Sequence, residues 1–201
     1  MNNQKLTAKD VILTGALTAL MFIISMVISM VMSMLGYVTN VFYPPVVALV
    51  NGIVMMLLLA KVPKRGVMTI SGVIQGLLFL LMGAFWCLPV SLIVGGIVGD
   101  LLIANGGKIT TKTMTLAYAI FSAIFTFGAI APINLLQESY IATCVKNGIA
   151  QDYIDGLIRM TSAPMLIVIV VVGFVCGFLG ALLGQKMLNK HFVKAGLVSA
   201  R

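Results

Sequence analysis

The sequence predicts an all-α polytopic membrane protein, a single bundle of about six transmembrane helices with both termini in the cytoplasm. Hydrophobic residues make up 61% of its 201 residues, and charged residues only 9%, against about 25% in a typical soluble domain. The apolar residues fall in long runs, and most of the basic residues lie between those runs. Because a soluble fold of this size cannot hide so much apolar surface, most of the chain must be solvated by lipid.

Six apolar segments reach, or nearly reach, the roughly 20 residues that a helix needs to cross a bilayer. They are residues 11–35, 41–59, 67–85, 89–103, 114–131 and 164–188. The first segment is too long for the apolar part of a signal peptide, and no small-residue cleavage site follows it. We therefore expect it to remain as the first span of a single domain covering residues 1–201.

The basic residues predict the orientation of these spans. In a six-span arrangement, eleven of the thirteen basic residues fall on one side, which the positive-inside rule assigns to the cytoplasm. These are Lys5, Lys9, Lys61, Lys64, Arg65, Lys108, Lys112, Lys186, Lys190, Lys194 and Arg201. Five or seven spans would scatter them over both sides. The net charge of +8 is thus explained by cytoplasmic loops of a multi-pass cell-membrane protein, and we expect no nucleic-acid partner.

The predicted outer side carries one long connection, residues 132–163. It holds three of the five acidic residues, Glu138, Asp152 and Asp155. Tyr153, Leu157 and Met160 recur at helical spacing within it. We expect an ordered extracellular segment of short helices that caps the bundle.

Enzyme signatures are missing from the sequence: it contains no HExxH, no GxSxG and no P-loop motif. The single histidine, His191, lies in the basic C-terminal tail, where a solvated or headgroup-facing side chain is expected. Cys87, Cys144 and Cys176 show no CxxC spacing, so apolar packing is favoured over metal binding. Cys87 and Cys144 are both expected on the outer side, where a pairing between them stays open. We expect neither enzymatic activity nor a resident cofactor.

Asp100 is the one acidic residue well inside an apolar segment. A carboxylate in a membrane span is a candidate for function. Asp100 is nevertheless expected within one turn of the cytoplasmic end, where it would pair with a lysine or cap a loop. No second acid at similar depth completes a proton relay, which weakens the case for an ion-coupled transporter.

Small residues recur every four positions along the first span and allow another helix to approach closely. One row contains Gly15 and Ala19, and a second contains Ala8, Ile12 and Ala16. Each row has two interpretations: packing within this protein, or docking onto another membrane subunit.

Aromatic and amide residues gather at the predicted outer ends of the spans. They are Tyr37, Asn40, Tyr43, Trp86, Asn134, Gln137, Glu138 and Tyr140. Tyrosine and tryptophan are also common at membrane interfaces. Their grouping with amides and one carboxylate favours a binding pocket for a small organic ligand.

The chain resembles the substrate-binding S component of an energy-coupling factor (ECF) transporter, of the Trep_Strep type of membrane protein. The resembling stretches are KLTAKD (5–10) leading into Gly15 and Ala19, LAKVPK (59–64), GAFW (83–86), GGIVGD (95–100), QDYID (151–155) and GALLGQKMLNKHF (180–192). Their order and spacing cover nearly the whole chain.

The resemblance implies a subunit that captures a vitamin- or cofactor-like nutrient outside and topples in the membrane to deliver it inward. It implies as partners a transmembrane T subunit and two ABC ATPases. It places the binding site near residues 37–43, Trp86 and residues 134–140, and it places T-subunit docking on small residues of the first span, here Gly15, Ala16 and Ala19.

The sequence leaves open the ligand and two other functions. A tetrapyrrole such as haem would need Tyr37, Tyr43, Cys87 or a methionine as an axial ligand, because the outer side carries no histidine; another vitamin or a modified base is the alternative. A self-sufficient secondary transporter or channel, or less readily a membrane enzyme, would also fit a small polytopic protein.

Overall fold

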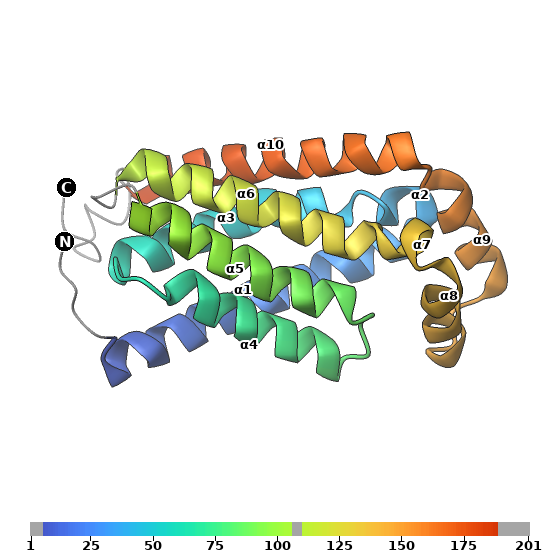
Figure 1. The fold of residues 1–201 in the computed structure, drawn as a ribbon, viewed down its shortest axis with the longest axis horizontal. Helices are drawn as coiled ribbons and strands as arrows, with labels where there is room; N and C mark the ends of the chain where they lie inside the picture. The colour runs from blue at the N-terminus through green and yellow to red at the C-terminus, as the bar shows by residue number, and fades with distance from the viewer. Residues whose placement is uncertain (1–5, 106–109, 189–201) are drawn as a thin grey trace.

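The computed structural model describes residues 6–105 and 110–188, and within these ranges the chain is helical and has no strands (Figure 1). Six long helices form the bundle: α1 (Ala8–Met34), α3 (Tyr43–Lys61), α4 (Val67–Leu81), α5 (Cys87–Asn105), α6 (Thr111–Ile130) and α10 (Ala163–Met187). Four short helices complete the described part: α2 (Tyr37–Asn40), α7 (Pro132–Leu135), α8 (Gln137–Lys146) and α9 (Gln151–Met160). The all-α bundle predicted from the sequence is confirmed.

The lengths of the helices match the thickness of a membrane. Four segments of the described chain are long and apolar enough to cross a bilayer: α1, α3, α6 together with α7, and α10. Helices α4 and α5 are apolar but shorter. The chain is therefore a multi-pass membrane protein, as expected of a protein in the bacterial cell membrane.

Each predicted span overlaps one long helix, and local chemistry explains where the ends differ. Helix α3 begins at Tyr43 rather than residue 41, and Pro44 and Pro45 occupy its first turn, where proline removes no helical hydrogen bond. Helix α4 ends at Leu81, four residues short of the prediction. Gly83 follows with φ +81°, a left-handed conformation that stops the helix.

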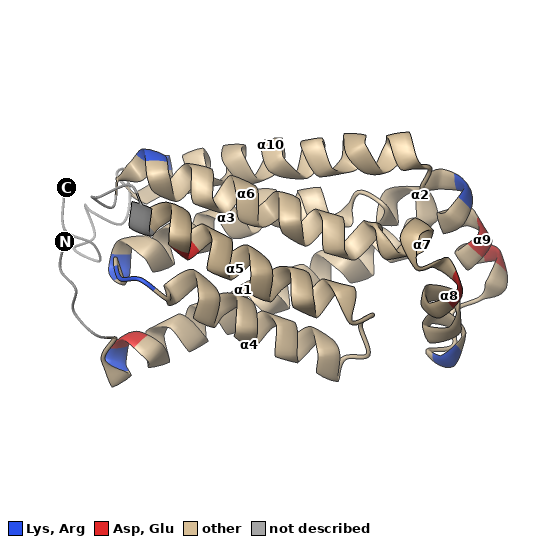
Figure 2. Ribbon diagram, in the orientation of Figure 1, with Lys and Arg blue, Asp and Glu red and all other residues tan. Residues whose placement is uncertain are grey.

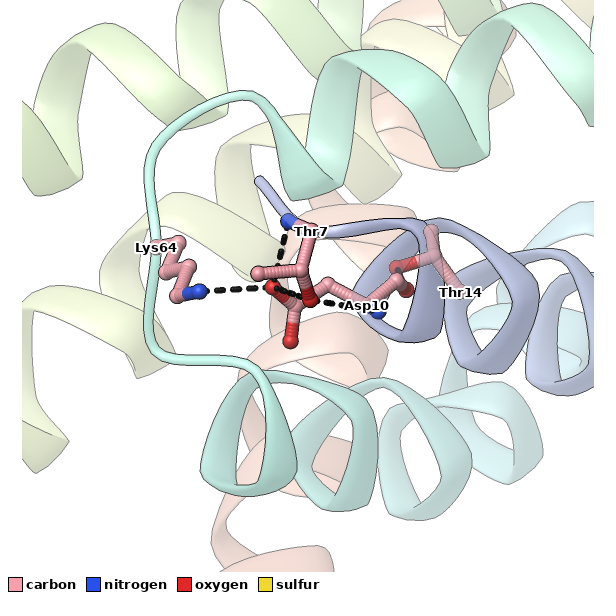
Figure 3. A network of polar contacts seen from close by, with 4 residues as sticks. All are labelled: Thr7, Asp10, Thr14 and Lys64. Atoms are coloured by element: carbon pink, nitrogen blue, oxygen red, sulfur yellow. Dashed lines mark hydrogen bonds and ion pairs between the residues drawn. The ribbon is translucent and has the colours of Figure 1, made fainter. Parts of the chain in front are cut away.

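A capping box starts α1 (Figure 3). The Thr7 amide donates to Asp10 Oδ2 over 2.8 Å, and the Asp10 amide donates back to Thr7 Oγ1 over 3.3 Å, so two amides that the helix leaves free gain partners. Asp10 Oδ2 also lies 2.6 Å from Lys64 Nζ. This ion pair ties the start of α1 to the α3–α4 connection.

Close helix contacts hold the interior together. A Cβ added to Gly180 on α10 would lie 2.8 Å from the Ala48 carbonyl oxygen of α3, and one added to Gly184 would lie 2.9 Å from the Gly52 carbonyl oxygen. Gly96 on α5 similarly faces the backbone of α4 at Thr69. Helices α3 with α10, and α4 with α5, therefore pack backbone against backbone, an arrangement that only small residues permit.

Charges collect at the two ends of the bundle (Figure 2). We call the end where α1 begins the basic end and the end formed by α2, α7, α8 and α9 the capped end. The helix bounds place Lys9, Lys61, Lys64, Arg65, Lys112 and Lys186 at the basic end, and Lys146 and Arg159 at the capped end. Lys5, Lys108, Lys190, His191, Lys194 and Arg201 lie outside the described residues. This distribution agrees with the prediction, made from the positive-inside rule, that the basic end is cytoplasmic.

Asp100 is a structural cap between two helices. Its side chain is buried, with 8% of its surface exposed. It accepts hydrogen bonds from the Thr69 amide over 2.8 Å, the Thr69 hydroxyl over 2.6 Å and the Met68 amide over 3.3 Å. Gly66 precedes α4 and has no side chain to cap it, so Asp100 of α5 supplies the acceptors that the start of α4 needs.

Candidate functional site

The capped end is built from the α1–α3 connection and from the long connection between α6 and α10. Helix α9 buries Ile154, Gly156 and Leu157 against the bundle. At Gly156 the Tyr37 ring of α2 lies so close that an added Cβ would be 2.6 Å from Tyr37 Cγ. Glycine at this position therefore lets α2 and α9 interlock, and the predicted helical cap over the bundle is present.

Aromatic rings gather in close pairs beneath and within this cap. Tyr37 and Tyr153 meet edge to face with ring centroids 6.3 Å apart, and Tyr43 meets Phe125 in the same way at 6.4 Å. Tyr140 lies close enough to Tyr43 and Tyr153 for their hydroxyl groups to interact electrostatically. We call Tyr37, Tyr43, Tyr140 and Tyr153 the tyrosine cluster.

The cluster extends to the α4–α5 connection. The Phe85 ring lies 5.8 Å from Tyr140 and 5.7 Å from Trp86, measured between centroids. The Asn147 amide after α8 donates to the Gly83 carbonyl oxygen over 3.0 Å. Helix α8 is thus fastened to the α4–α5 turn, which brings Trp86 beside the tyrosine cluster.

Two phenols and one amide give the cluster neutral groups suited to hydrogen bonding. Burial raises the pKa of Tyr140 and of Tyr153 above the ordinary value for tyrosine, so both phenols stay protonated at neutral pH. Asn40 accepts a hydrogen bond from Ser33 Oγ over 3.0 Å. The Tyr153 hydroxyl is buried beside this pair and makes no hydrogen bond within the described residues.

The eight residues singled out from the sequence do not all converge. Tyr37, Asn40, Tyr43 and Tyr140 lie in or beside the tyrosine cluster, and Trp86 joins it through Phe85. Asn134 instead donates to the Thr161 carbonyl oxygen and so ties α7 to the end of α9. Gln137 and Glu138 are exposed in the first turn of α8.

The sequence reasoning missed Phe85, Phe125 and Tyr153 as members of this site. Tyr153 carried a usable signal, because it shares a helical face with Leu157 and that face had to pack on the bundle. Phe125 carried none, since a phenylalanine in an apolar span resembles any other core residue.

An apolar groove lies beside the cluster, between α5, α6 and α7. Its volume is about 440 Å³, within the range of small-molecule sites. Trp86, Phe127, Leu135 and Leu136 are among the residues that line it. Trp86, with 53% of its surface exposed, borders both the groove and the cluster.

Metal-binding side chains do not gather in the described part of the chain. Within residues 6–105 and 110–188, no three His, Cys, Asp or Glu residues lie close enough together to hold an ion. Cys87, Cys144 and Cys176 are free thiols, and Cys144 is buried in α8. Cys87 and Cys144 are therefore not paired with each other.

The small residues of α1 lie on a helix with much free surface. Helix α1 has the smallest buried share of the four long apolar segments. Ala8, Ile12 and Ala16 are exposed, whereas Gly15 and Ala19 are half-buried. A Cβ added to Gly15 would meet nothing within 4 Å, so its surroundings leave room for a neighbouring helix.

Comparison with known protein families matches residues 8–194 to a family described as "Hypothetical bacterial integral membrane protein (Trep_Strep)". Neither the curated proteins nor the solved structures contain a match.

Proposed function

Because the chain belongs to the Trep_Strep family of bacterial integral membrane proteins, and because a tyrosine cluster lies under a helical cap at one end of its bundle, we propose that it is a substrate-binding S component of an ECF-type importer. Its substrate is a vitamin- or cofactor-like nutrient taken from the outer side.

The tyrosine cluster is the observation that carries this proposal. Protonated phenols and the amide of Asn40 offer neutral hydrogen-bonding groups, and the surrounding rings offer faces for stacking. The neighbouring groove adds an apolar surface. A few polar groups in a mostly apolar pocket are what recognition of an organic nutrient requires.

In this proposal the ligand enters through the cap. Helices α2, α8 and α9 are short, and each is joined to the bundle by connections at the capped end. Separation of α2 from α9 would open the contact between Tyr37 and Tyr153 and expose the buried Tyr153 hydroxyl, without disturbing the long helices. Lids of this kind are drawn from the less stable parts of a structure.

The transport step requires partners in this proposal. The sequence has no P-loop, so the energy would come from two ABC ATPases acting through a transmembrane T subunit. The exposed face of α1 at Ala8, Ile12 and Ala16, together with the open space at Gly15, supports α1 as the docking helix.

The alternative of a self-sufficient secondary transporter is less well supported. Such a protein needs a polar group free to bind its ion or proton. Asp100, the natural candidate, already accepts three hydrogen bonds at the start of α4.

Mass spectrometry and an absorption spectrum of the ligand released from detergent-purified protein test the proposal. A bound metabolite that loses affinity in a Tyr140→Ala variant supports the outer site, and a Soret band with a porphyrin mass identifies a tetrapyrrole. Ion-driven uptake by the protein reconstituted alone would contradict the S-component assignment.

A further inference from the structure

Asn51 is a buried amide halfway along α3, in the interior of the bundle. Only 5% of its surface is exposed. Its Nδ2 donates to the Met21 carbonyl oxygen over 3.1 Å and to Ser25 Oγ over 2.9 Å, both on α1. Its Oδ1 is buried and accepts no hydrogen bond from the described residues.

The orientation of this amide follows from its partners. The Met21 carbonyl can only accept, so the Asn51 atom that faces it must be the nitrogen. The Ser25 hydroxyl already donates to the same carbonyl over 2.7 Å, so it cannot donate to Asn51. Exchange of the amide oxygen and nitrogen would place two acceptors together, and the free acceptor is therefore Oδ1.

A small cavity adjoins Asn51 in the interior. Its volume is about 10 Å³, and its polar lining comes from Asn51, Ser25, Gln75, Tyr118 and Ser122. This volume is about the minimum that admits one water molecule. An organic nutrient is far too large for it, so the cavity is not the outer site described above.

Groups that can hold a water molecule line this cavity besides Asn51. Gln75 Nε2 uses one hydrogen on Ser71 Oγ, at 3.3 Å, and keeps a second. Ser122 Oγ donates to the Tyr118 carbonyl oxygen over 2.8 Å and keeps a free lone pair. An internal water needs two to four such partners.

We propose that this cavity binds one water molecule, which donates a hydrogen bond to Asn51 Oδ1. A carbonyl without a partner is expensive in a protein interior, and more so in a membrane where bulk water is absent. The donor must be neutral, because no charged side chain of the described residues lines the cavity to balance a charged ligand.

The water completes a polar layer that joins α1 to the rest of the bundle. Thr18 of α1 donates to Ser71 of α4 over 3.0 Å, and Gln75 donates to the same Ser71 oxygen. The Asn51 bonds attach α1 to α3 about one to two turns further along α1. Helix α1 therefore keeps a fixed register although most of its surface lies outside the bundle.

The test is a structure of the full chain in lipid nanodiscs, with a bound antibody fragment where added mass is needed, at a resolution that shows ordered waters. The expected result is a density peak about 2.7 to 3.2 Å from Asn51 Oδ1. An empty cavity, or a rotated Asn51 whose Oδ1 meets a protein donor, would overturn the proposal.

An NMR measurement on the native protein tests for the same water molecule and needs no variant. In protein labelled with ¹⁵N-asparagine, magnetisation transfer from long-lived water to the Asn51 side-chain amide is expected. Asn134, whose amide donates to Thr161, serves as a reference within the protein. Absence of transfer to Asn51 at a sensitivity that detects water beside exposed Asn147 would contradict a bound water.

Discussion

Replacement of Asp100 tests whether this intramembrane acid caps a helix or takes part in transport. Asp100→Ala removes the acceptor of two backbone amides, those of Met68 and Thr69, at the start of α4. The Thr69 hydroxyl also loses its partner, but it can rotate toward another acceptor. The variant therefore leaves two backbone amides without hydrogen bonds, one of them buried and the other partly buried.

The expected loss of stability follows from these contacts. Removal of a helix N-cap costs about 0.5 to 2 kcal/mol, and a hydrogen bond to a charged group contributes about 1.5 to 3 kcal/mol. Burial of Asp100 raises the expected cost, whereas the long Met68 contact, at 3.3 Å, contributes little. We therefore expect Asp100→Ala to lose about 3 kcal/mol of stability. At about 2 to 4 °C per kcal/mol for a chain of this size, the midpoint should fall by roughly 6 to 12 °C.

The stability of Asp100→Asn should lie between that of the native protein and that of Asp100→Ala. Asparagine is a good N-cap residue and keeps one oxygen to accept from the Thr69 amide. Its nitrogen replaces the second acceptor, so we expect a loss of about 1 to 2 kcal/mol. Asp152→Asn is the matched control, because Asp152 is exposed in the first turn of α9 and should change stability by less than about 1 kcal/mol.

Thermal unfolding in one detergent, followed by circular dichroism, measures all three variants. An Asp100→Ala midpoint equal to that of Asp152→Asn would refute the capping argument. If Asp100→Asn instead kept native stability and native ligand affinity but failed in uptake, the secondary-transporter alternative would be supported.

The other predictions concern packing, docking and the outer site. Gly52→Ala should unfold at a lower temperature than the native protein, because an added Cβ would lie 2.8 Å from the backbone of Gly180. Gly15→Ala, in open space, should instead be stabilised by up to about 1 kcal/mol through helix propensity. Equal midpoints of the two variants in thermal melts would contradict the close packing of α3 against α10. The pair Gly15→Leu with Ala19→Leu should abolish co-purification with a T subunit and leave ligand affinity unchanged, and an intact pull-down would rule out docking on this row. Tyr140→Ala should weaken ligand binding about tenfold in calorimetry, since an aromatic contact contributes about 0.5 to 1.5 kcal/mol beyond its buried area, and native affinity in a folded variant would remove Tyr140 from the site.

The bundle itself was predictable because its signals are local. Apolar length shows that a segment crosses the membrane, and this property needs no knowledge of its neighbours. Prolines at 44 and 45 and the glycine at 83 shift two helix ends by a few residues, through backbone preferences that sequence reading places only approximately. The cap was also predictable, because Tyr153 and Leu157 repeat at helical spacing in a polar segment.

The candidate site was predictable only in part. Tyr37, Asn40 and Tyr43 are neighbours in the chain, so their proximity follows from one short connection. Whether Tyr140 or Glu138 would face them depended on the rotation of α8, and a two-residue difference places one in the cluster and the other in solvent. No pattern in a ten-residue helix of near-neutral hydropathy determines that rotation; the contact with Phe85 does.

What the sequence determined by itself is the class of protein, the apolar segments and the side on which positive charge collects, because each depends on composition along a single stretch of chain. Only the tertiary structure decided what the polar residues inside the bundle do. Asp100 caps α4, and Asn51 joins α3 to α1 while keeping one acceptor free. The partners of both are 26 or more positions away in sequence, and a hydrogen bond over such a separation exists only once the helices have packed.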